Sequence, residues 1–202
     1  FDYEILPAHT PTYTFEATQG TVAATMNGTA VTSGGEIAYD KPAVFKITAK
    51  SGYVLGKLTV DNQVVNLPEG TFDATTKVTT YAAYTTANLK TAMSINVEFT
   101  AKKTVSVSAS PLSATRDEIA ADKNLPTVTF TPSISGQKYQ FKNASGTLMD
   151  KLPATDGVYT IVATSPETAD YAALTDESNK FTISQANKLS WSVEGEQGTV
   201  TA

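Results

Sequence analysis

The stretch Val44-Phe-Lys-Ile-Thr-Ala49 decides the fold class, because apolar and polar side chains alternate along it. Phe45 and Ile47 fall on one face and Lys46 and Thr48 on the other. A period of two residues is typical of a half-buried strand in an antiparallel sheet. The same alternation recurs further along the chain, at 95–100, 105–108, 159–162 and 181–183. The pattern therefore predicts several short strands.

Turn-forming residues separate these stretches, at Asn27-Gly28, Ser33-Gly34-Gly35, Ser51-Gly52, Asp61-Asn62, Glu69-Gly70, Ser145-Gly146, Asp156-Gly157 and Glu194-Gly195. Strands that recur every roughly 8–12 residues with such turns indicate small sandwiches or sheets. Thr86–Ala92 and Asp117–Asp122 could each form a turn or two of helix. Neither segment carries an apolar face long enough for a stable helix. The fold class we predict is all-β with minor α content.

Composition agrees with this fold class and excludes several chemistries. The 202 residues include 33 Thr, 9 Tyr and 8 Phe, which suit a pleated surface. The sequence has no Cys, so disulfides, thiolate metal sites and cysteine nucleophiles are excluded. A Ser-His-Asp triad would have to use the single His, His9, which lies near Pro7 and Pro11. The sequence thus indicates neither an enzyme nor a cofactor.

Net charge and segment composition bear on partners and location. The formal charge is −5, whereas binding to nucleic acid phosphates requires a basic surface. We interpret the one notable basic pair, Lys102-Lys103, as part of a solvated linker. No apolar run is long enough to cross a membrane. Residues 1–10 lack the basic start and apolar centre of a signal peptide, so we expect a mature portion or a fragment of a longer protein.

An internal repeat indicates modular organisation. The twelve residues from Tyr13 to Ala24 align without gaps on the twelve from Trp191 to Ala202, with six identities that include the run Gln-Gly-Thr-Val. The offset of 178 residues is too long for one small repeat unit. It fits two different modules in tandem, after which the first type begins again.

Short polar segments at 101–103 and 184–187 mark the predicted boundaries between modules. We expect a leader or linker at 1–12, a first β module at 13–101 and a second at 102–185. Residues 186–202 are then the incomplete start of a second copy of the first module type.

The first module carries the segments Gly20-Thr-Val22, Val44–Ala49, Gly52-Tyr-Val-Leu-Gly-Lys-Leu-Thr-Val-Asp-Asn62 and Met93-Ser-Ile-Asn-Val-Glu-Phe99. Over 13–100 their order resembles the InlB B-type repeat family of bacterial surface proteins, and Gly52-Tyr53 followed by Leu-Thr-Val-Asp61 is the most specific part. The chain departs from the family at Gln63, where a Gly is usual, and in a longer stretch at 69–91. The resemblance implies a small β-grasp-like module.

The second module contains Asp156-Gly-Val-Tyr-Thr-Ile-Val-Ala-Thr164, then Asp170-Tyr171 and Phe181-Thr-Ile183. This pattern is similar to bacterial Ig-like modules of large surface proteins, and it implies an Ig-like β-sandwich. The expected architecture is therefore a series of small antiparallel β modules, first β-grasp-like and then Ig-like. Both families occur in long exported proteins, which implies an extracellular or cell-surface location.

Exposed aromatic rings can stack on sugars, and the candidates are Tyr39, Tyr81, Tyr84 and Trp191. Tyr81 and Tyr84 belong to the unusual 69–91 stretch, where a loop could present both rings to a glycan or host ligand. The composition favours the other interpretation, in which these rings pack in the core or at a strand edge.

The acidic residues give two further possibilities. They lie in predicted turns and polar loops, where a solvated role is expected: Asp117-Glu118, Asp150, Asp156, Glu167, Asp170 and Asp176-Glu177. A structural Ca²⁺ site would use such oxygens, but no Asp-x-Asp-x-Asp-Gly spacing occurs. An intramolecular isopeptide bond would draw on Lys103 and Asn179, with Glu118 or Glu167 as the catalytic acid.

Together these observations predict a non-enzymatic spacer or adhesive stalk, part of a secreted or surface-bound adhesin. Its partners would be neighbouring domains of the same long chain and, in addition, a host or glycan ligand. The alternative is a carbohydrate- or host-ligand-binding module that uses Tyr81 and Tyr84. No metal and no catalytic residue is indicated.

Overall fold

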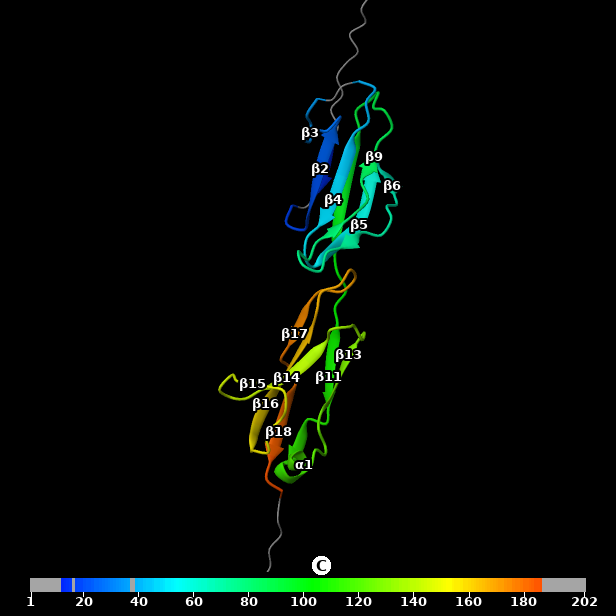
Figure 1. The fold of residues 1–202 in the computed structure, drawn as a ribbon. Coiled ribbons are helices and arrows are strands. Elements are labelled where there is room, and N and C mark those ends of the chain that lie inside the picture. Colours follow the sequence, from blue (N-terminus) through cyan, green and yellow to red (C-terminus); the bar gives the residue numbers. More distant parts are fainter. Residues whose placement is uncertain (1–11, 16, 37–38, 187–202) are drawn as a thin grey trace, which may run out of the picture. The chain divides into compact units, whose positions relative to one another are not determined.

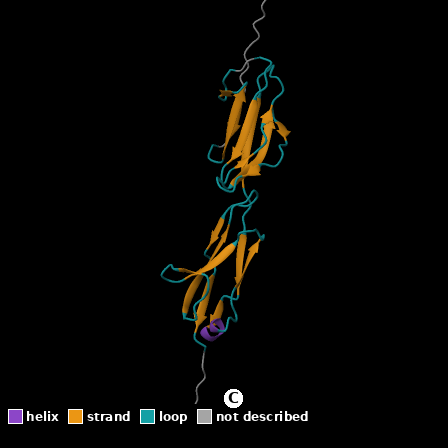
Figure 2. Cartoon of the chain, in the orientation of Figure 1, coloured by secondary structure: helices purple, strands orange, loops and turns teal. Residues whose placement is uncertain are grey.

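The computed structural model describes residues 12–15, 17–36 and 39–186, and Figures 1 and 2 show strands joined by loops with one short helix. The all-β prediction is confirmed at this level. The chain divides into two compact units. Unit 1 runs through Ser106 and also takes in Ile134–Gly136 and Ser165–Leu174, while unit 2 holds the other residues from Val107 onward. The repeated segment 191–202 lies outside the described residues.

Unit 1 contains two sheets, one with strand order β1-β10-β5-β6 and one with order β3-β2-β4-β8-β7, in which β9 also pairs with β4. The strands are β1 (Thr12–Phe15), β2 (Gly20–Met26), β3 (Thr29–Val31), β4 (Val44–Ala49), β5 (Tyr53–Val60), β6 (Gln63–Val65), β7 (Thr71–Phe72), β8 (Thr79–Thr80), β9 (Tyr84–Thr85) and β10 (Ser94–Ala101). The described part of Thr86–Ala92 contains no helix.

Both sheets contribute to one hydrophobic core in unit 1. Phe45 and Ile47 of β4 are fully buried, as the alternation in the sequence predicted, and Leu58 of β5 is 1 % exposed. Ile95 and Val97 of β10 complete the same cluster. Burying both inner faces is what holds the two sheets together.

Two tight hairpins set the register of adjacent strands in unit 1. Asn27-Gly28 joins β2 to β3 and Asp61-Asn62 joins β5 to β6, and all four residues have positive φ. Positive φ at both central positions is the requirement of a type I′ turn, which matches the right-handed twist of the paired strands. These turns lie where the sequence predicted them.

Unit 2 also has two sheets, a pair β11-β13 and a larger sheet of order β12-β18-β16-β14-β15, in which β17 pairs with β16. The elements are β11 (Ser106–Ser110), β12 (Ser113–Thr115), α1 (Arg116–Ala120), β13 (Thr127–Thr131), β14 (Lys138–Lys142), β15 (Leu148–Met149), β16 (Gly157–Ser165), β17 (Leu174–Asp176) and β18 (Lys180–Ser184). The core cluster of unit 2 consists of Ala114, Ile119, Phe141, Tyr159, Ile161, Phe181 and Ile183.

The helix α1 is short but capped at its start. Thr115 accepts the Glu118 N–H through its hydroxyl, and the Glu118 carboxylate accepts the Thr115 N–H in return. This capping box satisfies donors that a helix start leaves unpaired. The helical turn expected at 117–122 thus forms at 116–120, where it places Ile119 in the core.

The expectation of purely antiparallel modules is wrong at two places. β1 pairs with β10 in parallel, Thr12 opposite Ser94 and Phe15 opposite Val97. β12 likewise pairs with β18 in parallel, Ser113 opposite Thr182. Both pairs join segments far apart in the sequence, so no turn between adjacent strands could have revealed them.

The glycine of the repeated Gln-Gly-Thr-Val run has a packing role. A Cβ at Gly20 on β2 would lie 2.1–2.6 Å from the ring atoms of Phe99 on β10. The Phe99 ring is 7 % exposed and occupies the place of that missing methyl group. Gly20 therefore allows the two sheets of unit 1 to approach each other at this point.

Replacing Gly20 with alanine is expected to destabilise unit 1 by about 1–3 kcal/mol, because the added methyl group overpacks the core. The unfolding free energy from urea denaturation measures this loss. Ala23→Val on the exposed face of the same strand is the control and should change the stability little. Adding Phe99→Leu to Gly20→Ala should restore part of the stability. If the stability changes of the two substitutions are simply additive, this account is contradicted.

Candidate functional site

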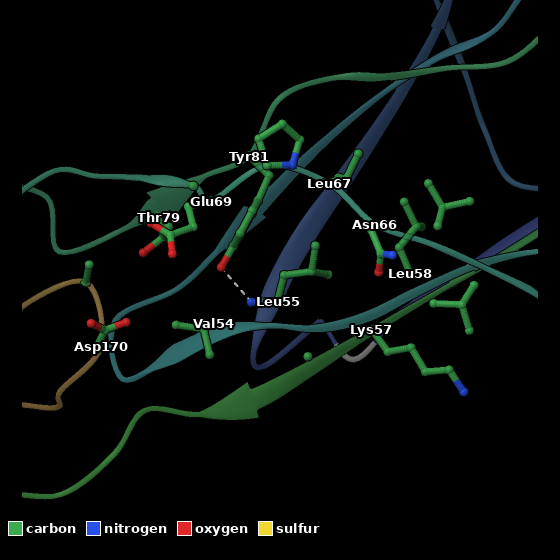
Figure 3. Close-up of a pocket in the computed structure, with 16 residues that line it drawn as sticks. Val54, Leu55, Lys57, Leu58, Asn66, Leu67, Glu69, Thr79, Tyr81 and Asp170 are labelled. Carbon is green, nitrogen blue, oxygen red and sulfur yellow. Dashed lines mark hydrogen bonds between the residues drawn. The ribbon is translucent and has the colours of Figure 1, made fainter.

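Tyr81 lies in the interior of unit 1 beside a cavity of about 360 Å³. Its hydroxyl oxygen accepts a hydrogen bond from the Leu55 backbone N–H at 2.7 Å, and Figure 3 shows the ring directed toward β5. The side chain is 9 % exposed, and burial raises the pKa of the phenol despite the Leu55 hydrogen bond, which lowers it. Of the two alternatives, the structure places Tyr81 in the core rather than on an exposed loop.

Tyr84 is half-buried on β9, next to the fully buried Phe45 in the register of β4 and β9. It packs against the core of unit 1. Tyr39 is also half-buried, and Trp191 lies outside the described residues. Neither Tyr81 nor Tyr84 offers a fully exposed ring for stacking, and glycan binding through them stays a prediction.

The cavity beside Tyr81 lies between β5 and the chain segment that follows β6. Part of its wall is aliphatic, from Val54, Leu55, Leu58, Val65, Leu67 and Pro68, and part is polar, from Lys57, Asn66 and Thr79. Two carboxylates, Glu69 and Asp170, also line it, and both residues are exposed. A general acid for hydrolysis is usually a carboxyl in an apolar, desolvated position, and neither of these has that environment.

Unit 1 contains a buried charged cluster that the sequence patterns did not predict. The Lys102 ammonium donates to Glu167 Oε1 at 2.8 Å and to the Thr168 carbonyl at 2.6 Å. Glu167 also accepts the Ser51 hydroxyl at 2.6 Å and the Gly52 backbone N–H at 2.7 Å. The Lys102 and Glu167 side chains are 0 % and 4 % exposed. A buried ion pair persists where further hydrogen bonds satisfy its atoms, as they do here.

The solvated-linker interpretation is therefore wrong for Lys102, and the solvated-loop interpretation is wrong for Glu167. Lys102 lies 4.1 Å from the centre of the Phe72 ring, and its backbone N–H donates to the Gly52 carbonyl. Adjacent residues of an extended chain point in opposite directions, so Lys103 remains exposed, 5.8 Å from the Tyr171 ring. Composition cannot reveal which lysine of the pair points inward.

Burial by itself would raise the pKa of Glu167. The hydrogen bonds from Lys102, Ser51 and Gly52, together with the charge of Lys102, outweigh burial and hold the pKa below its ordinary value of 4.5. The cluster thus favours the ionised carboxylate in the folded state. The cluster is a structural ion pair, and it anchors Ser165–Leu174 within unit 1.

The residues considered for an isopeptide bond are divided between the two units. Lys103 belongs to unit 1, whereas Glu118 and Asn179 belong to unit 2. Glu118 is engaged in the capping box of α1, which lowers its pKa, and the Asn179 side chain donates to the Ser178 hydroxyl. The fourth residue, Glu167, is paired with Lys102.

Within the described residues, no three His, Asp or Glu side chains gather in a way that could hold a metal ion. The helix of the same part of the chain is too short to cross a membrane. Comparison with known protein families, with curated proteins and with solved structures found no match to this chain.

Replacing Glu167 with glutamine is expected to destabilise unit 1 by roughly 3 kcal/mol, because the Lys102 ammonium is left buried without a counter-ion. The double variant Lys102→Met with Glu167→Leu should lose less stability than Glu167→Gln alone. Thermal unfolding followed by the amide NMR signals of unit 1 measures both. A double variant less stable than the single one would contradict the ion-pair account.

The same pair predicts a pH dependence. The Glu167 pKa is lower in the folded than in the unfolded state, so the unfolded chain binds more protons at acidic pH. The stability from this group is complete above its ordinary pKa of 4.5 and is lost as the pH falls through the folded-state pKa. The unfolding free energy from urea denaturation should be measured between pH 7 and pH 3, an interval of about four pH units that spans the titration of carboxylates. It should fall less for Glu167→Gln than for the parent chain. Equal declines in both proteins would refute this role of Glu167.

Tyr81→Phe is expected to cost about 1 kcal/mol, because the Leu55 N–H loses its acceptor. Tyr84→Phe is the matched control and should be close to neutral, since no hydrogen bond of its hydroxyl is present in the structure. Chemical denaturation of the two variants in parallel gives the difference. A Tyr84 variant as unstable as the Tyr81 variant would contradict the assignment.

Proposed function

We propose that this chain is a non-enzymatic structural segment, a spacer or adhesive stalk of an exported bacterial surface protein, whose modules transmit tension along the chain. The observation that carries the proposal is the parallel pairing of β1 with β10 and of β12 with β18. In each unit these are terminal or near-terminal strands.

In unit 1 the parallel pairing fixes where the chain enters and leaves. The chain enters at Thr12, at the start of β1, and β10 continues past its last pairing with β1 as far as Ala101. Because the two strands run the same way, a pull on both ends of the unit slides them along each other. All hydrogen bonds of the ladder then carry the load together instead of opening one at a time.

Side-chain contacts reinforce β1 at the edge of its sheet. Thr14 Oγ1 donates to Asn96 Oδ1 on β10 at 2.8 Å. On the other side, the Tyr13 N–H donates to the Ser33 hydroxyl, which in turn donates to the Tyr13 carbonyl. The strand is thus held on both sides, and the outer backbone groups of Tyr13 are not free to pair with another chain.

Unit 2 has a parallel ladder between its second strand, β12, and its last strand, β18. Ser113, Ala114 and Thr115 of β12 lie opposite Thr182, Ile183 and Ser184 of β18. The Thr182 N–H also donates to the Leu112 carbonyl at 2.9 Å. Because β11 precedes β12 and pairs with β13, a pull on both ends of this unit reaches the parallel ladder through β11.

The finer architecture belongs to the same proposal. A β-grasp-like first module and an Ig-like second module fit the sequence resemblances to InlB B-type repeats and bacterial Ig-like modules. The two-sheet arrangement of unit 2, with its core between them, supports the Ig-like assignment. An extracellular or cell-surface location, and neighbouring domains as partners, follow from those resemblances.

Single-molecule force spectroscopy tests the proposal on the whole chain, pulled from its two ends. Thr14→Pro removes a backbone donor that faces β10, because its neighbour Tyr13 bonds to Ser33 on the opposite side. We expect this variant to lower the unfolding force of unit 1 clearly. Val64→Pro is the control, since Val64 is 60 % exposed on β6 and takes no part in the β1–β10 ladder.

If both proline variants lower the force equally, the ladder does not bear the load and the proposal is wrong. If neither unit of the parent chain shows resistance above that of a chain pulled open strand by strand, the spacer function loses its support.

A further inference from the structure

We propose that the cavity beside Tyr81 in unit 1 binds a primary alkylammonium group, that is, an aliphatic chain that ends in an ammonium. The lysine side chain of another polypeptide and a free alkylamine both have this chemistry. The proposal goes beyond a spacer function and does not rest on it, because it gives unit 1 a ligand of its own. It depends on an aliphatic wall, on two carboxylates at one end of the cavity and on a buried hydroxyl without a partner.

The aliphatic part of the wall is only partly covered by the protein itself. Val54, Leu55, Val65 and Leu67 line the cavity and are half-buried. The volume of about 360 Å³ lies within the range of roughly 300–1,000 Å³ that small-molecule sites occupy. An aliphatic chain in this cavity would remove apolar surface of both partners from water, which favours binding.

The fold places Asp170 at the end of the cavity where β5 begins. Ala101 of β10 lies opposite Tyr53, the first residue of β5. Two residues further along the chain, the Lys103 N–H donates to the Asp170 carbonyl at 2.9 Å. Asp170 belongs to the part of unit 1 that Ser165–Leu174 contributes, and it lines the cavity.

Glu69 lies at the same end, because the segment 66–70 runs back along β5. The segment starts after Val65, which lies opposite Leu58. It ends at Gly70, where a Cβ would lie 2.9 Å from the ring of Tyr81. The hydroxyl of that ring accepts the Leu55 N–H, so the segment has moved toward the start of β5.

Figure 3 shows the same division of the cavity, with Glu69, Thr79 and Asp170 on one side of the Tyr81 ring and Lys57 on the other. One end of the cavity is therefore acidic. An aliphatic chain with a positive charge at one end fits this polarity.

Neither carboxylate has a cation of its own. Glu69 and Asp170 are exposed, and no ion pair of the described residues involves either of them. Lys102 is engaged by Glu167, and the Lys103 ammonium lies 5.8 Å from the centre of an aromatic ring. The two carboxylates attract an ammonium and repel a ligand that ends in a carboxylate or a phosphate.

The buried hydroxyl belongs to Thr79. This residue lines the cavity and is 3 % exposed, and its Oγ1 has no hydrogen-bond partner among the described residues. A buried polar group without a partner destabilises the folded state, and a ligand group that bonds to it removes this cost. Two carboxylates and a hydroxyl are all acceptors, as the several N–H donors of a primary ammonium require.

The test uses the whole chain and two pairs of probes. Acetyl-lysine amide represents the side chain of a polypeptide, and acetyl-norleucine amide is its neutral control, with the same aliphatic chain and no ammonium. Hexylamine and hexanol form the corresponding pair for a free amine. NMR titration of the Leu55 and Tyr81 amide signals measures the dissociation constants.

We expect each ammonium probe to bind with about millimolar affinity and about fivefold more tightly than its neutral control. The pair with the larger ratio between charged and neutral probe identifies the source of the ammonium. Either source supports the shared chemistry.

Two variants test the acidic end and the hydroxyl separately. Glu69→Gln keeps the shape and removes one charge, so it should weaken ammonium binding about threefold and leave the neutral probes unchanged. Glu36→Gln is the matched control, since Glu36 is an exposed carboxylate of unit 1 outside this cavity, and it should leave binding unchanged. Thr79→Val removes the hydroxyl and should weaken ammonium binding, while the unfolding free energy in urea stays equal or rises.

Several results would overturn the proposal. Neither ammonium probe shifts the Leu55 or Tyr81 signal at its highest soluble concentration, or the neutral probes bind as tightly as the charged ones. Glu69→Gln binds the ammonium probes as the parent chain does. A neutral glycan shifts the same signals when the amines do not, which would identify a sugar as the occupant. A marked loss of stability in Thr79→Val would show that the hydroxyl already has a partner, which contradicts its assignment to a ligand.

Discussion

The parallel ladder between β1 and β10 is the interaction on which unit 1 depends, because it ties the first strand of the unit to the last. β10 in turn pairs with β5 along most of its length, and its Phe99 ring fills the space left by Gly20 in the other sheet. One strand thus connects the edge of its sheet, the centre of that sheet and the opposing sheet. Unit 2 has a related ladder, which ties its second strand, β12, to its last, β18.

Local chemistry was sufficient to predict much of this fold. The alternation in Val44–Ala49 predicted a strand with Phe45 and Ile47 inside, and Asn27-Gly28 and Asp61-Asn62 predicted two hairpins. The parallel ladders and the Lys102–Glu167 pair could not be predicted, because each joins residues distant in sequence. Lys102 and the exposed Lys103 are adjacent in the same polar stretch of sequence, and only the fold decides which one is buried.

The two proposals concern different parts of unit 1. At β1 the outer backbone N–H and C=O of Tyr13 are both bonded to the Ser33 hydroxyl, which suits a strand that bears load and must not pair with other chains. Beside β5, an aliphatic wall and two exposed carboxylates line a cavity that suits a small cationic ligand. The β1–β10 ladder and the cavity share no residue, so unit 1 could bear tension and still bind such a ligand.

The central claim is that the β1–β10 ladder resists tension in shear, and the direction of pulling tests it most directly. The chain has no native Cys, so two introduced cysteines define the points of attachment. One protein would be held at Thr12→Cys and Ala101→Cys, which slides the parallel strands; the other at Thr12→Cys and Ala92→Cys, which separates them from the paired end. We predict an unfolding force several times higher for the first pair of attachment points, and equal forces would contradict the account.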